Sequence, residues 1–330
     1  MHTLRNSLVI KILEMTLSPH HGLCTILASF FIVFGVAGQN TPLDSIDLLL
    51  AQRPSKEKQR ELLFLAAETA LKEDSTVNKV KSYTAALREM EGFGADSTLV
   101  MNALKLDAHA HRIIGNFSSS IAQFQLCHGY FAHVADTTNL AFTANQLGSM
   151  YVFMGQNEKA QHYLLQVYNI HKAQGNRRML ASATNGLAIF YNNTNQVEKA
   201  IARYEEALSM FQEVKDTMGQ ANVHANLGMT YVDQGEFSKA EYHIGMQGKL
   251  DSLLNTQWGL GFYFDYLGYL REKQGRYKEA YQNHLQSLKI REQLSSHYNV
   301  TESRISLANN LLKLERYNEA IEEGNKVFDN

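Results

Sequence analysis

The stretch "LGMTYVDQGEFSKA" at residues 227–240 joins an apolar helical pattern to a glycine-containing turn, within a chain of 330 residues. The related stretch "LAIFYNNTNQVEKA" stands 40 residues earlier, at 187–200, and "LGYLREKQGRYKEA" stands 40 residues later, at 267–280. A fixed period of roughly 20 to 50 residues is typical of a solenoid, in which each repeat packs on its neighbours. The repeat therefore decides the fold before any single motif is considered.

When the five repeats are aligned, three aligned positions, which we call columns, hold the same kind of residue in every repeat. A leucine is followed directly by a small residue, and an alanine stands 13 positions after the leucine. The leucines are Leu147, Leu187, Leu227, Leu267 and Leu307, the small residues are Gly148, Ala188, Gly228, Gly268 and Ala308, and the alanines are Ala160, Ala200, Ala240, Ala280 and Ala320. Small residues let two helices approach closely. Each repeat is therefore predicted to be a helical hairpin.

The two joints of each repeat carry different turn signals. Gly155, Gly235 and Gly275 mark the turn inside the hairpin, where a positive φ favours glycine. Asn195 and Glu315 break this column, so these two turns are expected to close differently. At the other joint, four side chains are predicted to cap the following helix. They are Asp136, Asn176, Asp216 and Asn255.

Tyr151, Tyr191 and Tyr231 stand four residues after the column leucine. With them the pattern becomes L-G/A-x-x-Y, then G, then A, which resembles the tetratricopeptide repeat over residues 140–330. Two departures are a period of 40 in place of the usual ~34 and the lack of a closing proline. The resemblance implies an all-α, right-handed solenoid of antiparallel helix pairs, in the longer-repeat variant of bacterial regulatory and sensory proteins.

The composition agrees with an all-α chain, because 45% of the residues are hydrophobic, only 3 are proline, and Ala, Leu, Gln, Glu, Lys and Met dominate. The expected domains are a signal peptide at 1–38, a lead-in at 39–57, degenerate hairpins forming an N-terminal cap at 58–138, and the repeat array at 139–330. The last repeat stops inside its second helix, which suggests a fragment of a longer protein.

The signal peptide is predicted from "LCTILASFFIVFGVA" at 23–37, an uncharged run of 15 residues. This run is too short for a membrane span and suits a signal-peptide core, with cleavage after Gly38. An uncleaved anchor and a buried helix are the alternatives, and either Met1 or Met15 can be the start. The expected location is the periplasm or cell envelope, with membrane contact only through this segment if it is uncleaved.

The charge balance and the motifs exclude several classes. A net charge of -2 with no basic cluster beyond Arg177 and Arg178 argues against nucleic-acid binding. Cys24 and Cys127 form no CxxC pair, so neither a disulfide scaffold nor a zinc site is indicated. No phosphate-loop, GxSxG, HExxH or EF-hand spacing occurs, which predicts no enzyme and no cofactor.

A metal site is not predicted either. Asp107, His109 and His111 form the most metal-like group, but only Asp107 and His111 share a helix face. Two ligands do not close a metal site, so we interpret these residues as solvated polar side chains.

The resemblance places the first helix of each repeat on a concave wall. Helical spacing of 100° per residue then selects the candidate groove for a protein or peptide partner. The predicted groove residues are Arg178, Asn185, Met218, Asn222, Asn226, Met229, Trp258, Phe262, Asp265, Tyr266 and Tyr269. The alternative is that the aromatic residues are core.

The carboxylate clamp of chaperone-binding relatives is not predicted, because no lysine stands at the place of its first lysine. Asn145, Asn185, Ala225 and Asp265 fill that place. The leading hypothesis is a non-catalytic protein- or peptide-binding scaffold. The alternative is the extracytoplasmic sensor region of a bacterial two-component or transcriptional regulator, whose output domain would follow Asn330.

Export gives the first testable prediction. If the apolar run at 23–37 is a cleaved signal, mass spectrometry of the protein from its native cell envelope should find a mature N-terminus near Gln39. A chain that keeps Met1 or Met15 in the soluble cytoplasm would contradict it.

Overall fold

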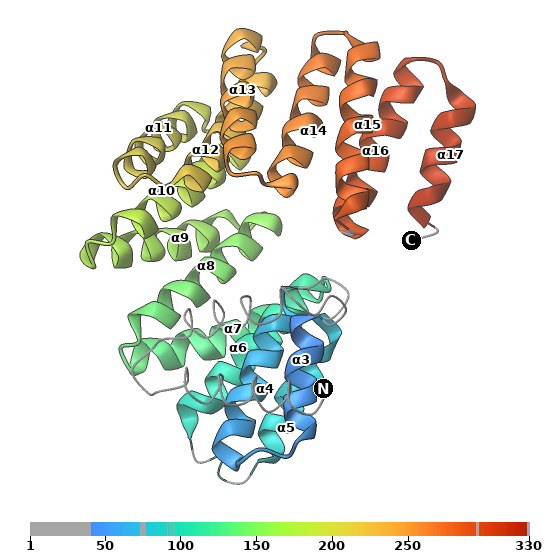
Figure 1. Ribbon diagram of the computed structural model, residues 1–330. Helices are drawn as coiled ribbons and strands as arrows, with labels where there is room; N and C mark the ends of the chain where they lie inside the picture. The colour runs from blue at the N-terminus through green and yellow to red at the C-terminus, as the bar shows by residue number, and fades with distance from the viewer. Residues whose placement is uncertain are drawn as a thin grey trace. The chain divides into compact units, whose positions relative to one another are not determined.

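The computed structural model describes residues 41–72, 77–90, 92, 94, 96–294 and 297–328, and every regular element among them is a helix (Figure 1). The predicted all-α fold is confirmed. The chain divides into two compact units, Met1–Phe93 and Gly94–Asn330. The predicted signal peptide lies outside the described residues. None of the described helices is both long enough and apolar enough to cross a membrane.

The described part of the first unit holds three helices and one helical turn: α3 (Pro42–Ala51), α4 (Lys56–Ala70), η1 (Val77–Lys79) and α5 (Val80–Glu89). A capping box starts α3, since the Thr41 hydroxyl accepts from the Asp44 backbone N–H at 3.2 Å and the Asp44 carboxylate accepts from the Thr41 N–H at 3.0 Å. Helix α4 packs between α3 and α5.

The second unit is an array of helical hairpins of nearly constant size. Its helices are α6 (Ser97–Ile113), α7 (Phe117–His133), α8 (Thr137–Phe153), α9 (Asn157–Ala173), α10 (Arg177–Asn193), α11 (Val197–Glu213), α12 (Thr217–Asp233), α13 (Phe237–Leu253), α14 (Gln257–Lys273), α15 (Tyr277–Gln293), α16 (His297–Lys313) and α17 (Tyr317–Phe328). Each helix from α6 to α16 has 17 residues, and three residues separate it from the next. Two such helices with their joints make the 40-residue period.

The joints inside the hairpins all use the same backbone conformation. Gly155, Gly235 and Gly275 have φ of 68°, 73° and 74°, and Asn195 and Glu315 have φ of 58° and 60°. The expectation that Asn195 and Glu315 close their turns differently is therefore wrong. Asparagine tolerates the left-handed region better than most residues, and the long helices on both sides hold Glu315 there.

The helix caps at the other joint agree with the prediction in three cases out of four. Asp136, Asn176 and Asp216 each accept a hydrogen bond from the backbone N–H three residues later, at 3.0, 3.1 and 2.9 Å. Asn255 does not cap α14, because it takes the left-handed conformation with φ of 53°, and Thr256 occupies the cap position. The prediction for Asn255 is wrong by one residue.

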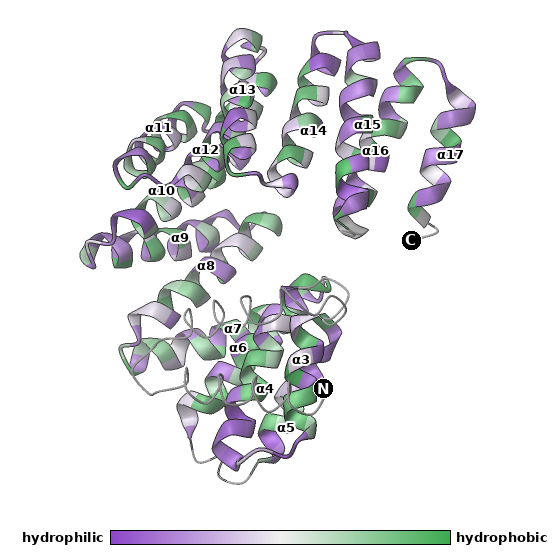
Figure 2. Cartoon of the chain, viewed as in Figure 1, coloured by the Kyte–Doolittle hydropathy of each residue, from purple (hydrophilic) through white to green (hydrophobic). Residues whose placement is uncertain are grey.

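Close helix approach in each hairpin depends on the small-residue column. A Cβ atom on Gly148 would lie 2.9 Å from Leu164 Cγ, and one on Gly228 would lie 2.7 Å from Ile244 Cγ1. Both distances are below ordinary van der Waals contact, so a side chain at either glycine would push the two helices apart. In Figure 2 hydrophobic and hydrophilic residues share each helix of the array, as expected for helices with one buried face.

The hairpins stack in chain order. The second helix of one hairpin packs on the first helix of the next, as α11 does on α12 and α13 on α14. Successive first helices also touch one another, in the order α10, α12, α14 and α16. The first helices therefore form one layer, and residues that recur every 40 positions lie side by side in it.

The small-residue column yields a stability prediction. Gly228→Leu should lower the free energy of unfolding by about 1 to 3 kcal/mol, because the new side chain collides with Ile244. Gly129 in α7 is the matched control, since a Cβ there meets nothing within 4 Å. Gly129→Leu should leave the stability unchanged or raise it by up to about 1 kcal/mol through helix propensity. Urea denaturation measures both, and equal losses would show that the helix contact is misplaced.

Candidate functional site

All eleven predicted groove residues lie on the contacting first helices α10, α12 and α14. The structure thus places them in one layer. Those with exposed side chains are Arg178, Met218, Asn222 and Trp258. Those with half-buried side chains are Asn185, Asn226, Met229, Phe262, Asp265, Tyr266 and Tyr269. Their role in binding stays a prediction.

An aromatic run follows α14 from its first turn. The Trp258 ring lies 4.6 Å from the Phe262 ring, and the Phe262 ring lies 5.9 Å from the Tyr266 ring. Trp258 is 57% exposed, so its large apolar surface is open to a ligand. The guanidinium of Arg291, from α15, sits 4.5 Å from the centre of the Phe262 ring and holds that ring by a cation–π contact.

An amide pair joins two neighbouring first helices. Asn226 Nδ2 donates to Asn185 Oδ1 at 3.1 Å, which links α12 to α10. Each of these amides retains hydrogen-bonding capacity beyond this contact. Asn222, one turn earlier on α12, is exposed. The layer therefore offers amide donors and acceptors of the kind that pair with a peptide backbone.

The tyrosines of α14 have a structural role as well. Tyr266 and Tyr269 both pack against the core cluster that contains Leu227 and Ile244. Tyr269 Oη also donates to Asp233 Oδ1 at 3.0 Å. Burial raises the pKa of both tyrosines above the ordinary value. Loss of either ring would therefore disturb packing as well as any ligand contact.

Asp265 belongs to a buried charge network rather than to an open ligand site. Its carboxylate lies 3.0 Å from His284 Nδ1 and 3.5 Å from Arg291 Nη1. His284 and Arg291 are 1% and 2% exposed. Arg291 Nη1 also donates to Ser303 Oγ at 2.7 Å, which connects α15 to α16. The network ties three helices of the array together.

The protonation of His284 is set by this network. Burial by itself lowers the pKa of an imidazole, but hydrogen bonds and attraction from Asp265 and Glu272 outweigh it and raise the pKa of His284 to about 9. Glu272 Oε1 lies 3.5 Å from His284 Nε2. At neutral pH His284 is therefore an imidazolium between two carboxylates.

The sequence reasoning missed this network, although a signal was present. His284 stands in the column that faces the small residue of the first helix, where the three preceding repeats have Leu164, Tyr204 and Ile244 and the last repeat has Gly324. A histidine among these large residues at a buried position requires partners for its ring nitrogens. Following that column, in addition to the three that define the repeat, would have marked His284 as a buried polar site.

The interpretation of Asp107, His109 and His111 as solvated side chains is wrong, because Asp107 is 5% exposed and both histidines are half-buried. Asp107 is buried, and His109 Nε2 lies 2.9 Å from Arg112 Nη2. Burial, reinforced by Arg112 and Lys105, lowers the pKa of His109 to about 4. Over the described ranges no cluster of three or more His, Cys, Asp or Glu side chains can hold a metal ion.

His284 gives a prediction of pH dependence. Its pKa is raised from 6.5 to about 9 in the folded chain, so its stabilising effect is fully present below pH 6.5 and is lost as the pH rises through about 9. His284→Gln should therefore cost more stability at pH 6 than at pH 10, by about 3 kcal/mol. Urea denaturation of both proteins at each pH measures the difference. An equal cost at the two values would contradict a charged His284.

Comparisons with known proteins agree with this architecture. The tetratricopeptide repeat models match residues 143–173, 179–244 and 263–330. Regulatory protein RapK of Bacillus subtilis (strain 168) is 27% identical over 143 residues, which make up 42% of this chain and 38% of that relative. The match thus spans well under half of either protein.

Two solved structures share the fold over most of their length. A Rap protein complexed with competence and sporulation factor superposes with a TM-score of 0.64 at 13% identity, over 99% of this chain and 96% of that chain. NprR in complex with its cognate peptide NprX gives a TM-score of 0.54 at 17% identity, over 79% of this chain and 77% of that chain. The repeat columns, the stacked hairpins and these matches together establish that the chain belongs to the tetratricopeptide repeat family.

Proposed function

We propose that this chain is a non-catalytic regulatory scaffold that binds an extended peptide along α10, α12 and α14. The observation that carries the proposal is the combination of an exposed Trp258 with amide side chains on first helices that touch one another. Aromatic anchors supply most of the binding energy at such surfaces, and amides satisfy the peptide backbone. The NprR relative, which binds its cognate peptide NprX, supports this class of partner.

The charges of this layer indicate what kind of peptide fits. Arg178 is paired with Asp216 at 2.5 Å, and Asp265 is paired with His284 and Arg291. Neither side chain offers an unbalanced charge to a ligand. The proposed ligand therefore binds through its backbone and apolar side chains, and a chaperone-type grip on a terminal carboxylate is not part of the proposal.

The apolar run at 23–37 supports the further proposal that the scaffold works outside the cytoplasm. The same run favours the alternative role as the input region of a bacterial sensor or transcriptional regulator. RapK, described as a regulatory protein, is consistent with either role. Reading the gene beyond codon 330 separates the two, since only the alternative requires an output domain there.

The peptide proposal predicts a selective loss of affinity. Peptides selected from a random displayed library on the full chain should bind in calorimetry, and Trp258→Ala should weaken the binding by about 2 kcal/mol. Asn222→Ala should weaken it by about 1 kcal/mol through the lost hydrogen bond. Both side chains are exposed, so both variants should unfold at nearly the wild-type temperature.

Tyr242→Ala is the matched control. Tyr242 is an exposed aromatic residue, like Trp258, but it lies on the second helix α13. Its truncation should leave peptide affinity unchanged. If Tyr242→Ala weakens binding as much as Trp258→Ala, or if no peptide is enriched, the first helices are not the binding surface.

A further inference from the structure

A row of exposed apolar side chains lies where second helices end and first helices begin. Met218 and Trp258 stand in the first turns of α12 and α14, and Leu253 ends α13. These three are 54%, 57% and 76% exposed. We call the row the apolar edge, and its members are Val214, Met218, Leu253, Leu254, Trp258 and Leu294.

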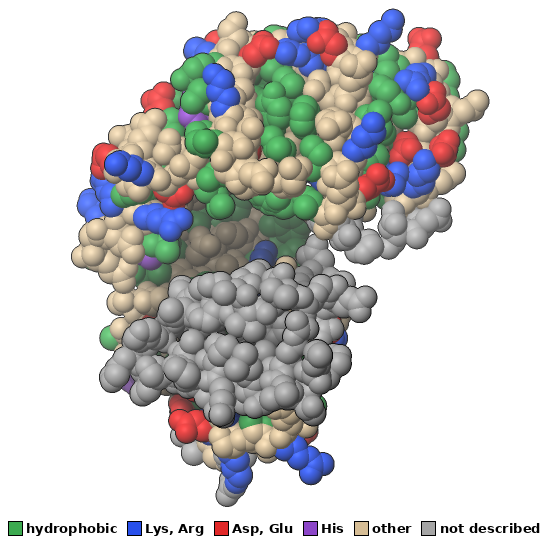
Figure 3. Space-filling view, in the orientation of Figure 1, with side chains coloured by type: hydrophobic (Ala, Val, Ile, Leu, Met, Phe, Trp, Pro, Cys, Tyr) green, Lys and Arg blue, Asp and Glu red, His purple; other side chains and the backbone are tan. Residues whose placement is uncertain are grey.

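The members of the apolar edge come from three consecutive joints, which follow α11, α13 and α15. Since these hairpins stack in order, the three joints lie on the same side of the stack. On the face seen in Figure 3, apolar side chains gather over α13 and α14. Soluble proteins rarely leave so many large apolar side chains together in water without a binding partner.

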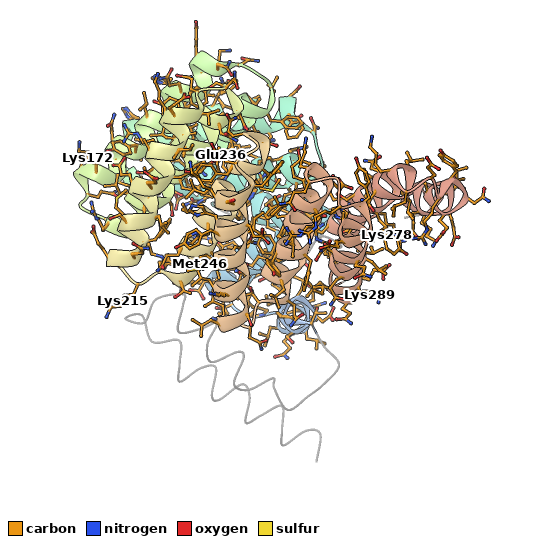
Figure 4. All side chains as sticks on the ribbon, turned by 90° about the horizontal axis from the view of Figure 1, so that it is seen from above. Lys172, Lys215, Glu236, Met246, Lys278 and Lys289 are labelled. Atoms are coloured by element: carbon orange, nitrogen blue, oxygen red, sulfur yellow. The ribbon has the colours of Figure 1, made fainter. Side chains whose placement is uncertain are left out.

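Lysines accompany the apolar edge without acidic partners. Lys215, Lys249 and Lys289 are exposed, and none forms an ion pair or side-chain hydrogen bond with another described residue. Figure 4 labels Lys215 and Lys289, which lie along the same margin of the array in that view.

The exposed acidic residues of these joints are already neutralised. Glu213 pairs with Arg177 at 2.8 Å and Glu292 pairs with Arg304 at 2.6 Å. Asp216 is held by Arg178 in the same way. The surface around the apolar edge therefore carries the unpaired positive charges of Lys215, Lys249 and Lys289, although the whole chain has a net charge of -2.

We propose that the apolar edge docks on the surface of an anionic lipid bilayer, with its apolar side chains among the acyl chains and its lysines at the headgroups. Large apolar side chains beside unpaired lysines are the combination that binds such a surface. The side chains are exposed at successive hairpin ends rather than around a cavity, which suits a soft, extended surface. A second copy of this chain fits less well, because a symmetric contact would bring the same lysines face to face.

The N-terminal sequence supports a bilayer as the occupant. The apolar run at 23–37 is predicted to be a cleaved export signal, with an uncleaved anchor and a buried helix as the alternatives. A single short apolar element gives weak attachment, and stable attachment takes a second signal such as a basic surface. If the run stays as an uncleaved anchor, the apolar edge supplies that second signal, and if the run is cleaved, the apolar edge is itself the proposed contact with the membrane. This docking does not depend on the proposed binding of a peptide.

The test uses the full chain with its own reporter, because Trp258 is the only tryptophan. Vesicles made of equal parts phosphatidylcholine and phosphatidylglycerol should shift Trp258 emission to shorter wavelength and protect it from acrylamide. The shift should weaken with salt and should be much smaller with pure phosphatidylcholine. The triple variant Lys215→Glu, Lys249→Glu, Lys289→Glu should require at least about tenfold more lipid for half the shift.

The control variant makes the same charge change at the other end of the hairpins. Lys159 and Lys278 lie near the starts of second helices, and Lys313 ends the first helix α16. Replacing these three by glutamate should leave the lipid dependence unchanged. No shift with anionic vesicles, or an equal effect of the two triple variants, overturns the proposal. A lipid-free dimer in sedimentation that Leu253→Lys dissociates also overturns it, because the apolar edge then joins two copies.

Discussion

The close approach of paired helices at the small-residue column is the constraint on which the second unit depends. At Gly148 and Gly228 a first helix lies so near its partner that no side chain fits between them. That contact fixes the register of each hairpin, and equal 17-residue helices with three-residue joints repeat the register along the chain. Because each hairpin contacts mainly its neighbours, the free energy of unfolding is approximately the sum of the contributions of these interfaces, and the unit has no single central core.

The repeated register also explains how residues far apart in the sequence come together in the proposed binding surface. Positions that recur every 40 residues lie side by side on the first helices, so Asn185 on α10 reaches Asn226 on α12. One face of α14 carries the run from Trp258 to Tyr266. The hairpin ends add Val214, Leu253, Leu254 and Leu294 to two of these surface residues, Met218 and Trp258, and so form the apolar edge. The proposed peptide surface and the proposed membrane surface thus overlap at Met218 and Trp258 and extend from there onto different parts of the array.

Much of the fold could be predicted because the relevant physics is local. Three columns, each filled five times, indicated the hairpins and their period, and side-chain caps at Asp136, Asn176 and Asp216 followed from residue type. The predictions that were wrong concern residues whose conformation is set by the structure around them. Asn195 and Glu315 adopt the left-handed turn because long helices on both sides impose it. Asn255 takes the left-handed conformation before α14, so the cap position falls on Thr256, one residue later than predicted.

The candidate site was predicted less completely for the same reason. Helical spacing selected residues that all lie on first helices, but it could not show that Asp265 is paired with His284 and Arg291, which belong to another helix. Pairing across helices depends on three-dimensional packing, and a single sequence reports it only indirectly. The break from Leu164, Tyr204 and Ile244 to His284 in one column was the available clue.

The three-residue joint has a consequence for how such a protein can change over time. Since every helix from α6 to α16 and every joint between them has the same length, a hairpin can be gained or lost by duplication or deletion of 40 residues without altering the contacts of the others. The number of hairpins then sets the length of the proposed peptide-binding surface. A single-residue insertion within a helix has the opposite effect, because it rotates all later side chains of that helix by about 100°. The array can therefore gain or lose whole hairpins, whereas the insertion of single residues into its helices disrupts their packing.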